Sequence, residues 1–398
     1  MSIPSLTVGV RWRRGGLLAL FAAVCSAQKY SIGPETPVYS KESGYGLDLG
    51  SSIGLKPFFF SVAVPEGNYD VTVTFGDANR ESITTVKAES RRLMIERVDT
   101  AAGEFTKRTF TVNVHTPKIA GGGEVRLKPR EIGILRWDDK LTLEFNGPRP
   151  AVTVVEIEKA DAITVYLMGD STVVDQPEEP WNSWGQMLTR FFKPGVAVAN
   201  HAESGETLRG STGEQRLKKV MSTIQRGDYL FIQFGHNDQK EKGEGIGAFT
   251  SYKADLKRYI AQAREHGATP VLVSPMNRRT FDADGKITNS LGDYPEAVRR
   301  AAEEESVALV DLNAMSKFFY EAMGAEESQK AFVDNTHHNN YGSYELAKCV
   351  VEGIKANKLA LAKFLVDVPT FDPSHPDPVA TFDVPRSPMS SMVKPDGN

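Results

Sequence analysis

A serine and an aspartate–histidine pair, far apart in the chain, have the residue types that nucleophilic catalysis needs. Ser171 follows the apolar run 163–168 and Gly169, as expected where a tight turn at the end of a strand exposes a hydroxyl. A serine hydroxyl needs an adjacent base, usually an imidazole that a third group holds in one tautomer. Asp334 and His337, three residues apart, can meet on one loop. These residues fit acyl transfer through a serine.

Two further segments offer donors for the oxyanion that forms when a serine attacks a carbonyl. They are 200–205 and 235–238, and each follows a predicted strand. The backbone N–H groups of Ser171 and Gly205 and the side-chain amide of Asn237 are suitable donors. Each segment alone also fits a solvated turn or a surface ion pair. Their common position at strand ends favours a shared site, because active sites of open α/β sheets lie there.

Other candidate residues have a structural alternative. Trp184 is a candidate substrate contact, because an indole can stack on a sugar ring, and core packing is its alternative. His236 could hydrogen-bond to substrate in the cleft, or support the loop around it. His337 and His338 with Asp334 could suggest a metal site, but no third histidine stands at a suitable spacing, so we expect no metal.

One further motif has the residues of a known nucleophile site but not the strand and helix that must flank such a site. Residues 50–54, Gly-Ser-Ser-Ile-Gly, match the Gly-x-Ser-x-Gly pattern of α/β-hydrolases. That pattern requires a strand before it and a helix after it, and Pro57 follows here without a helical pattern. We therefore expect no catalytic role for these residues.

The elements that must position the site come in two kinds. Residues 28–160 alternate apolar and polar side chains, which predicts half-buried strands and a β-sandwich. From 161 to 366, short apolar runs alternate with helical patterns, which predicts an α/β domain with a parallel sheet covered on both faces. The expected strands are 163–168, 196–200, 229–234, 270–273 and 308–312, and the expected helices are 183–192, 252–263, 295–305 and 341–356.

The two ends of the chain differ from these domains. Residues 1–27 combine three arginines, an apolar run and small residues before Gln28, which predicts a cleaved export signal and a secreted or periplasmic protein. The apolar run is too short for a membrane anchor, the main alternative. Residues 367–398 are rich in Pro, Asp and Ser and could wrap the fold or be disordered; we expect no chemistry from them.

Composition excludes several classes of function. The formal net charge of −4 gives no indication of nucleic-acid binding. No later segment is long and apolar enough to insert into a membrane. Only Cys349 remains beyond the export signal, so neither a disulfide framework nor a cysteine-based metal site is expected.

The four segments together resemble the SGNH (GDSL) hydrolases, and most closely the rhamnogalacturonan acetylesterases of carbohydrate esterase family twelve. The resemblance covers about 165 to 360 and rests on the amino-acid sequences of four short motifs. These are Met168–Thr172, with threonine after the serine, Trp184–Gln186, Phe234–Asp238 and Asp334–His337. A β-sandwich ahead of the hydrolase also resembles bacterial members.

The resemblance implies a flavodoxin-like three-layer fold behind a galactose-binding-like sandwich. It also implies Ser171 as nucleophile, His337 as base and Asp334 as the residue that orients it. Ser171 N–H, Gly205 N–H and the Asn237 amide would form the oxyanion hole. Family members deacetylate polysaccharides through a serine acyl-enzyme, without a cofactor.

We therefore expect an esterase acting on acetylated polysaccharide or oligosaccharide, with pectic rhamnogalacturonan as substrate by resemblance and acetylated xylan as an alternative. A lipase or thioesterase on the same scaffold would need a wide apolar acyl pocket. A carbohydrate-binding protein with a vestigial hydrolase domain is the non-enzymatic alternative, and the intact catalytic set argues against it.

Overall fold

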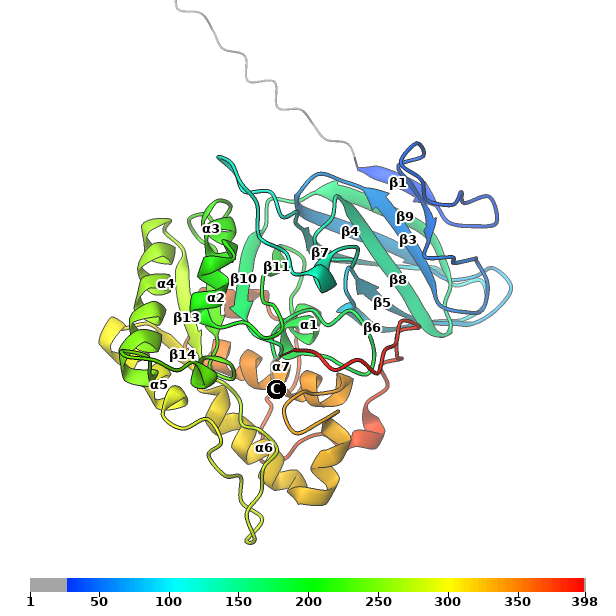
Figure 1. Ribbon diagram of the computed structural model, residues 1–398. Helices are drawn as coiled ribbons and strands as arrows, with labels where there is room; N and C mark the ends of the chain where they lie inside the picture. Colours follow the sequence, from blue (N-terminus) through cyan, green and yellow to red (C-terminus); the bar gives the residue numbers. More distant parts are fainter. Residues whose placement is uncertain (1–26, 397–398) are drawn as a thin grey trace, which may run out of the picture.

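Two structural units make up the chain in the computed structural model, which describes residues 27–396. A β-sandwich comes first, and a parallel sheet with helices on both faces follows it (Figure 1). Apart from Ala27, the expected export signal lies outside the described residues. None of the helices between 27 and 396 combines the length and the apolar character needed to cross a bilayer.

Two antiparallel sheets form the sandwich, with strand orders β1-β9-β4-β7 and β2-β3-β8-β5-β6. In β4, every second residue is buried, as period-two alternation predicts. The strands are β1 (Gln28–Ser31), β2 (Tyr45–Asp48), β3 (Phe58–Ala63), β4 (Gly67–Phe75), β5 (Ser82–Ala88), β6 (Arg92–Thr100), β7 (Thr106–Val114), β8 (Lys140–Arg149) and β9 (Val152–Lys159).

The parallel sheet has the order β11-β10-β12-β13-β14, which is the flavodoxin-like arrangement in which the first strand lies between the second and the third. Its strands are β10 (Ile163–Gly169), β11 (Val196–Asn200), β12 (Tyr229–Gln233), β13 (Thr269–Val273) and β14 (Ala308–Val310). Ligands of such sheets bind where the strand order reverses, here beside the carboxyl end of β10. The predicted fold class is confirmed.

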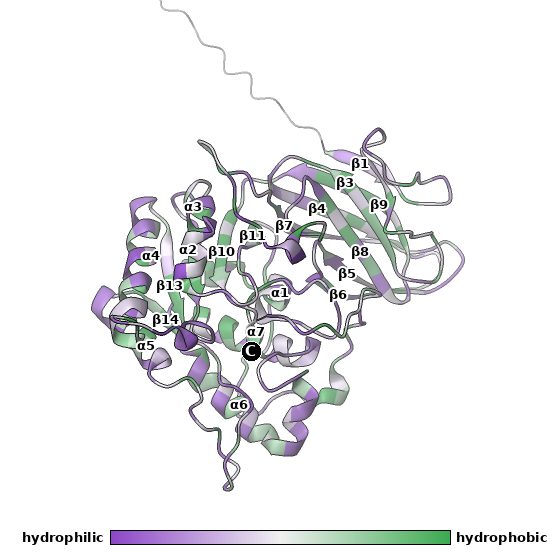
Figure 2. Cartoon of the chain, in the orientation of Figure 1, coloured by the Kyte–Doolittle hydropathy of each residue, from purple (hydrophilic) through white to green (hydrophobic). Residues whose placement is uncertain are grey.

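Within residues 27–396, seven α-helices cover this sheet, and two hydrophobic cores form on its faces. One core includes residues of α1, α6 and α7, and the other includes residues of α2, α3, α4 and α5. Figure 2 shows hydrophobic residues along the strands and mixed polarity on the outer helices α4 and α5. The helices are α1 (Trp184–Leu188), α2 (Leu208–Gly213), α3 (Arg216–Met221), α4 (Lys253–Glu265), α5 (Tyr294–Glu305), α6 (Leu312–Glu327) and α7 (Asn340–Ala356).

Buried ion pairs join the sandwich to the α/β unit. Arg92, at the start of β6, pairs with Asp175 at 2.7 Å, and both side chains are fully buried. The neighbouring Arg91 pairs with Glu179 at 2.6 Å. Both carboxylates belong to the loop that follows Ser171. Because an unpaired buried charge is costly, these pairs fix that loop against the sandwich.

The C-terminal segment 385–396 returns between the two units (Figure 1, red). Lys87 donates to the Pro385 carbonyl at 2.7 Å, and the Ser391 N–H donates to the Glu179 carbonyl at 2.9 Å. The segment thus wraps the fold, one of the two outcomes that its composition allowed, and it ends close to the predicted site.

Candidate active site

The serine, histidine and aspartate selected from the sequence form one hydrogen-bonded chain. Ser171 Oγ lies 2.8 Å from His337 Nε2, and His337 Nδ1 lies 2.9 Å from Asp334 Oδ2. Ser171 and His337 are each 1% exposed. This is the arrangement in which an imidazole can take a proton from the serine while a carboxylate holds its other nitrogen.

Asp334 is held as an anion by its own loop. Its Oδ1 accepts the backbone N–H groups of Thr336 and His337, each at 2.7 Å. Burial acts to raise the pKa of Asp334, but the hydrogen bonds from the side chain and backbone of His337 outweigh it and hold this pKa well below its usual range. Asp334 is therefore a charged carboxylate at neutral pH.

The neighbouring His338 faces away from the serine. Its Nε2 lies 2.8 Å from the Tyr320 hydroxyl, and its ring packs on Phe332. Burial lowers the pKa of His338 to about 3, so the ring is neutral at physiological pH. Within residues 27–396, no cluster of three His, Cys, Asp or Glu side chains is arranged to hold a metal ion.

Ser171 lies on the turn after β10, and close backbone packing and buried hydrogen bonds hold this turn in place. A Cβ at position 169 would lie 2.7 Å from the Gln233 carbonyl oxygen, so only glycine fits between β10 and β12. Asp170 is fully buried and accepts from the Thr172 N–H at 3.0 Å and from its hydroxyl at 2.7 Å. The same carboxylate lies 3.2 Å from His236 Nδ1. These bonds fix the turn.

The three expected oxyanion donors lie on the loops after β10, β11 and β12. Gly205 has a φ of +76°, a conformation that favours glycine. Asn237 Nδ2 donates to the Glu206 carbonyl at 3.0 Å, and its Oδ1 accepts from Lys240 at 3.2 Å, which leaves one amide hydrogen for a ligand. Among the described residues, neither Ser171 N–H nor Gly205 N–H has a protein acceptor.

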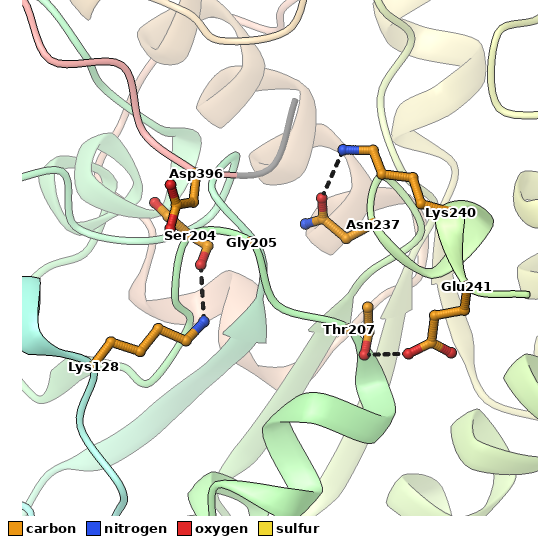
Figure 3. A pocket seen from close by; sticks show the side chains of 8 residues that line it. All are labelled: Lys128, Ser204, Gly205, Thr207, Asn237, Lys240, Glu241 and Asp396. Atoms are coloured by element: carbon orange, nitrogen blue, oxygen red, sulfur yellow. Dashed lines mark hydrogen bonds between the residues drawn. The ribbon is translucent and has the colours of Figure 1, made fainter.

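A pocket of about 460 Å³ adjoins Gly205 and Asn237. Figure 3 shows Asp396 of the C-terminal segment beside Ser204 on one side, and Asn237 with Lys240 on the other. Lys394 of the same segment lies 3.2 Å from Asp334 Oδ2. The lining is polar: Lys128, Ser204, Gly205, Thr207, Asn237, Lys240, Glu241 and Asp396.

The structure does not support the two expected substrate contacts. Trp184 is 1% exposed in the core, and its Nε1 donates to Gln233 at 2.8 Å. His236 is fully buried between Asp170 and the Met276 carbonyl, which lies 3.0 Å from its Nε2. Trp184 and His236 are therefore buried supports of the loops that form the site. Trp181 is the indole nearest the catalytic pair, edge-on to His337 at 5.7 Å between ring centroids.

Ser52, the central residue of the Gly-x-Ser-x-Gly motif at 50–54, lies in the loop of the sandwich between β2 and β3. The hydroxyl of the adjacent Ser51 accepts the Phe59 N–H at 2.8 Å, at the start of β3, and the next element after the motif is this strand and not a helix. The motif therefore lacks the strand–helix context of a nucleophile, as expected.

The sequence analysis missed a group of cations that the sandwich contributes to the site. Lys128, Arg130 and Arg136 lie between β7 and β8 and donate to backbone carbonyls of the Gly205 loop. These cations are far in sequence from the carbonyl groups that they contact, so no local sequence pattern predicts the contacts. The close spacing of Arg126, Lys128 and Arg130 is the one signal that the sequence carries.

Residues 167–343 match the model of the GDSL-like Lipase/Acylhydrolase family. Rhamnogalacturonan acetylesterase RhgT of Bacillus subtilis (strain 168) is 42% identical to the chain over 221 residues, which is 51% of this chain and 94% of that protein. The chain belongs to the GDSL-like lipase/acylhydrolase family. As a member of this family, it is a carboxylic ester hydrolase.

Two further relatives of this GDSL-like hydrolase extend the comparison. The probable rhamnogalacturonan acetylesterase YesY of Bacillus subtilis (strain 168) is 36% identical over 211 residues, 51% of this chain and 97% of that protein. The crystal structure of YxiM from Bacillus subtilis superposes with a TM-score of 0.49 at 24% identity, and covers 84% of this chain and 99% of that one.

Proposed function

We propose that this chain is a serine esterase that removes acetyl groups from plant cell-wall polysaccharide through an acyl-enzyme, with rhamnogalacturonan as its substrate. The observation that carries the proposal is the unbroken chain of hydrogen bonds from Ser171 through His337 to Asp334, at 2.8 and 2.9 Å. It is the geometry that a serine needs to become a nucleophile.

In the first half of the reaction, Ser171 Oγ attacks the acetyl carbonyl carbon while His337 Nε2 accepts the hydroxyl proton. Asp334 stabilises the imidazolium that results. The carbonyl oxygen becomes an oxyanion, and the N–H groups of Ser171 and Gly205 and the Asn237 amide donate to it. The C–O bond to the sugar then breaks, His337 returns the proton to the sugar oxygen, and an acetyl group stays on Ser171.

In the second half, water takes the place of the sugar hydroxyl. His337 accepts a proton from the water as its oxygen attacks the acetyl carbon, and the same donors stabilise the second oxyanion. The bond to Ser171 Oγ breaks, the proton passes from His337 to that oxygen, and acetic acid leaves and ionises to acetate in water. Atoms and charge balance without a cofactor.

The polar pocket supports a sugar substrate over a fatty acyl chain. Its lining includes lysines, a glutamate and amide or hydroxyl groups, whereas a lipase or thioesterase needs an apolar channel for its acyl group. The name of the relative RhgT supports rhamnogalacturonan as the substrate class. Acetylated xylan is the competing substrate.

The test is acetate release from acetylated rhamnogalacturonan and from acetylated xylan, at matched acetyl concentration. We expect a kcat/KM at least tenfold higher on rhamnogalacturonan. Equal values, or a preference for xylan, contradict the proposed substrate and leave the esterase chemistry in place. Serine-ester chemistry is tested separately, by Ser171→Ala.

We also propose that residues 1–27 direct export and that the protein acts outside the cytoplasm, since its polymeric substrate is extracellular. In this proposal 28–160 and 161–366 are the two domains, and 367–398 is a C-terminal tail. Fusing residues 1–27 to a periplasmic reporter tests the signal, and a reporter that stays in the cytoplasm contradicts it.

A further inference from the structure

One peptide group in the site is held from outside the hydrolase unit. It is the peptide that joins the carbonyl of Ser204 to the N–H of Gly205. Arg130 Nη2 donates to the Ser204 oxygen at 2.5 Å, and Lys128 Nζ donates to the same oxygen at 3.1 Å. Both cations come from the sandwich, on the segment between β7 and β8. The backbone oxygen thus receives two charged donors.

A trans peptide is planar, and its C=O and N–H point in opposite directions. Fixing the oxygen of Ser204 on one side therefore aims the hydrogen of Gly205 on the other. Charged donors on the oxygen also polarise the peptide, which strengthens its N–H as a donor. On the proposed function, that N–H is one of the oxyanion donors.

We infer that Lys128 and Arg130 are positioning residues that hold and polarise the Gly205 oxyanion donor, so that the sandwich takes part in catalysis through this peptide. Neither side chain reaches the reacting atoms in this role. The inference rests on the proposed function, because it needs an oxyanion at Gly205.

The cations are themselves fixed. Arg130 Nε donates to Glu203 at 2.9 Å, and Lys128 pairs with Glu206, which is 2% exposed. Arg136 donates to the Ala202 carbonyl at 3.1 Å, two residues before Ser204. Donors that cannot reorient are the ones that stabilise a developing charge efficiently.

A second carboxylate locks this cluster in place. Glu131 is 1% exposed and accepts from Arg136 at 2.6 Å, from Trp137 at 3.0 Å and from Arg216 of α3. Burial acts to raise the pKa of Glu131, but Arg136 and Arg216 lower it to about 2. Glu131 therefore stays charged, and through Arg136 and Arg216 it ties the sandwich to the hydrolase near the oxyanion loop.

The test replaces Arg130 and Lys128 by methionine, singly and together, in the full chain. Loss of a whole oxyanion donor costs about 10²–10³ in kcat. A weakened donor should cost less, so we expect about a tenfold loss of kcat in each single variant and up to about 10² in the double variant. KM for 4-nitrophenyl acetate should stay within about twofold, since substrate carries no oxyanion.

A second readout separates positioning from general structural support. A trifluoromethyl ketone forms a tetrahedral adduct with the active serine and places an oxyanion on the donors. Its inhibition constant should rise by the same factor by which kcat/KM falls. Arg130→Lys, which keeps a cation at this position, should recover most of the activity.

Two matched controls complete the design. Arg190→Met removes an interface cation that pairs with Glu96 at 2.9 Å and lies away from the oxyanion loop. Arg80→Met removes a sandwich cation that pairs with Asp77 at 2.9 Å. Both should keep kcat on 4-nitrophenyl acetate within about twofold of the unchanged chain.

The inference is overturned if the folded Arg130→Met and Lys128→Met variants keep kcat, or if the ketone binds them as tightly as it binds the unchanged chain. An equal loss in Arg190→Met also overturns it. Should Ser171→Ala keep its activity, the proposed function fails instead. The two failures are therefore distinguishable.

Discussion

Changing Asp334 to asparagine should abolish most activity without unfolding the chain. Asp334 Oδ1 accepts two backbone N–H groups, and Oδ2 accepts from His337. The amide oxygen of an asparagine would take the Oδ1 position, because its NH₂ group cannot face two N–H donors. That NH₂ would then face His337 Nδ1 and force the ring to accept there. The ring proton would move to Nε2, opposite Ser171.

A histidine with its proton on Nε2 cannot accept the proton of Ser171. The wrong tautomer costs about 10⁴ in kcat in serine hydrolases of this design. That factor corresponds to about 5 kcal/mol of transition-state stabilisation. The fold should survive, since the asparagine oxygen keeps both backbone hydrogen bonds of the loop.

The assay is the steady-state rate on 4-nitrophenyl acetate, with circular dichroism to confirm the fold. His338→Gln is the matched control, because it alters the adjacent residue and should keep kcat within about threefold. A kcat for the folded Asp334→Asn variant within tenfold of the unchanged chain would refute the assigned role of Asp334.

Three further perturbations have defined outcomes. Asn237→Ala should lower kcat about 10²–10³-fold with little change in KM, measured on 4-nitrophenyl acetate, because one oxyanion donor is lost; a change confined to KM would contradict this. The unfolding free energy should fall as the pH drops from about 6.5 toward 3, because His338 has its pKa lowered to about 3 by burial and the unfolded chain binds the proton first. Urea titrations should show that the unfolding free energy depends less on pH in His338→Gln. If the pH dependence is unchanged in that variant, a group other than His338 causes it. Ending the chain at Ser391 removes the side chains that pair with Asp334 and Arg130, and should lower KM for polymeric substrate about two- to fivefold. An unchanged or higher KM would mean that the segment does not compete with substrate.

The residues of the candidate site could be selected from the sequence because each stands at the end of an element with a clear pattern. Ser171 follows a strand whose residues 165–168, just before the turn, are apolar, and Gly205 and Asn237 follow the two strands that flank it in the sheet. In a parallel sheet, the carboxyl ends of neighbouring strands meet at one edge, so sequence order sufficed to bring these residues together. Asp334 and His337 are neighbours in the chain and need no tertiary information to meet.

The sandwich shows where sequence patterns carried less information. Apolar residues alternate with small or polar ones at 60, 62 and 64, at 71, 73 and 75, at 110, 112 and 114, and at 141, 143 and 145. This alternation predicts strands there, and the structure has β3, β4, β7 and β8 at these places. By contrast, β5 and β6 were missed because burial there is not alternating: Lys87 and Arg92 are buried among apolar residues. Their charges are satisfied by partners distant in sequence, Pro385 and Asp175, which no local pattern can reveal.

Partners distant in sequence also decide the positions of Trp184 and of the C-terminal segment. Trp184 was assigned to the cleft because indoles stack on sugars, but its N–H has a buried partner in Gln233, which makes core packing favourable. The C-terminal segment has a loop-like composition, yet specific contacts such as the bond from Lys87 to Pro385 hold it to the fold.

The central claim is that Ser171 carries the acetyl group during turnover. Acid quenching of the reaction with 4-nitrophenyl acetate, followed by peptide mass spectrometry, tests it directly. We predict one acetyl group on Ser171 of the unchanged chain, and neither acetylation nor acetate release above background in Ser171→Ala. An acetyl group on another residue, or undiminished acetate release from Ser171→Ala, would contradict the account.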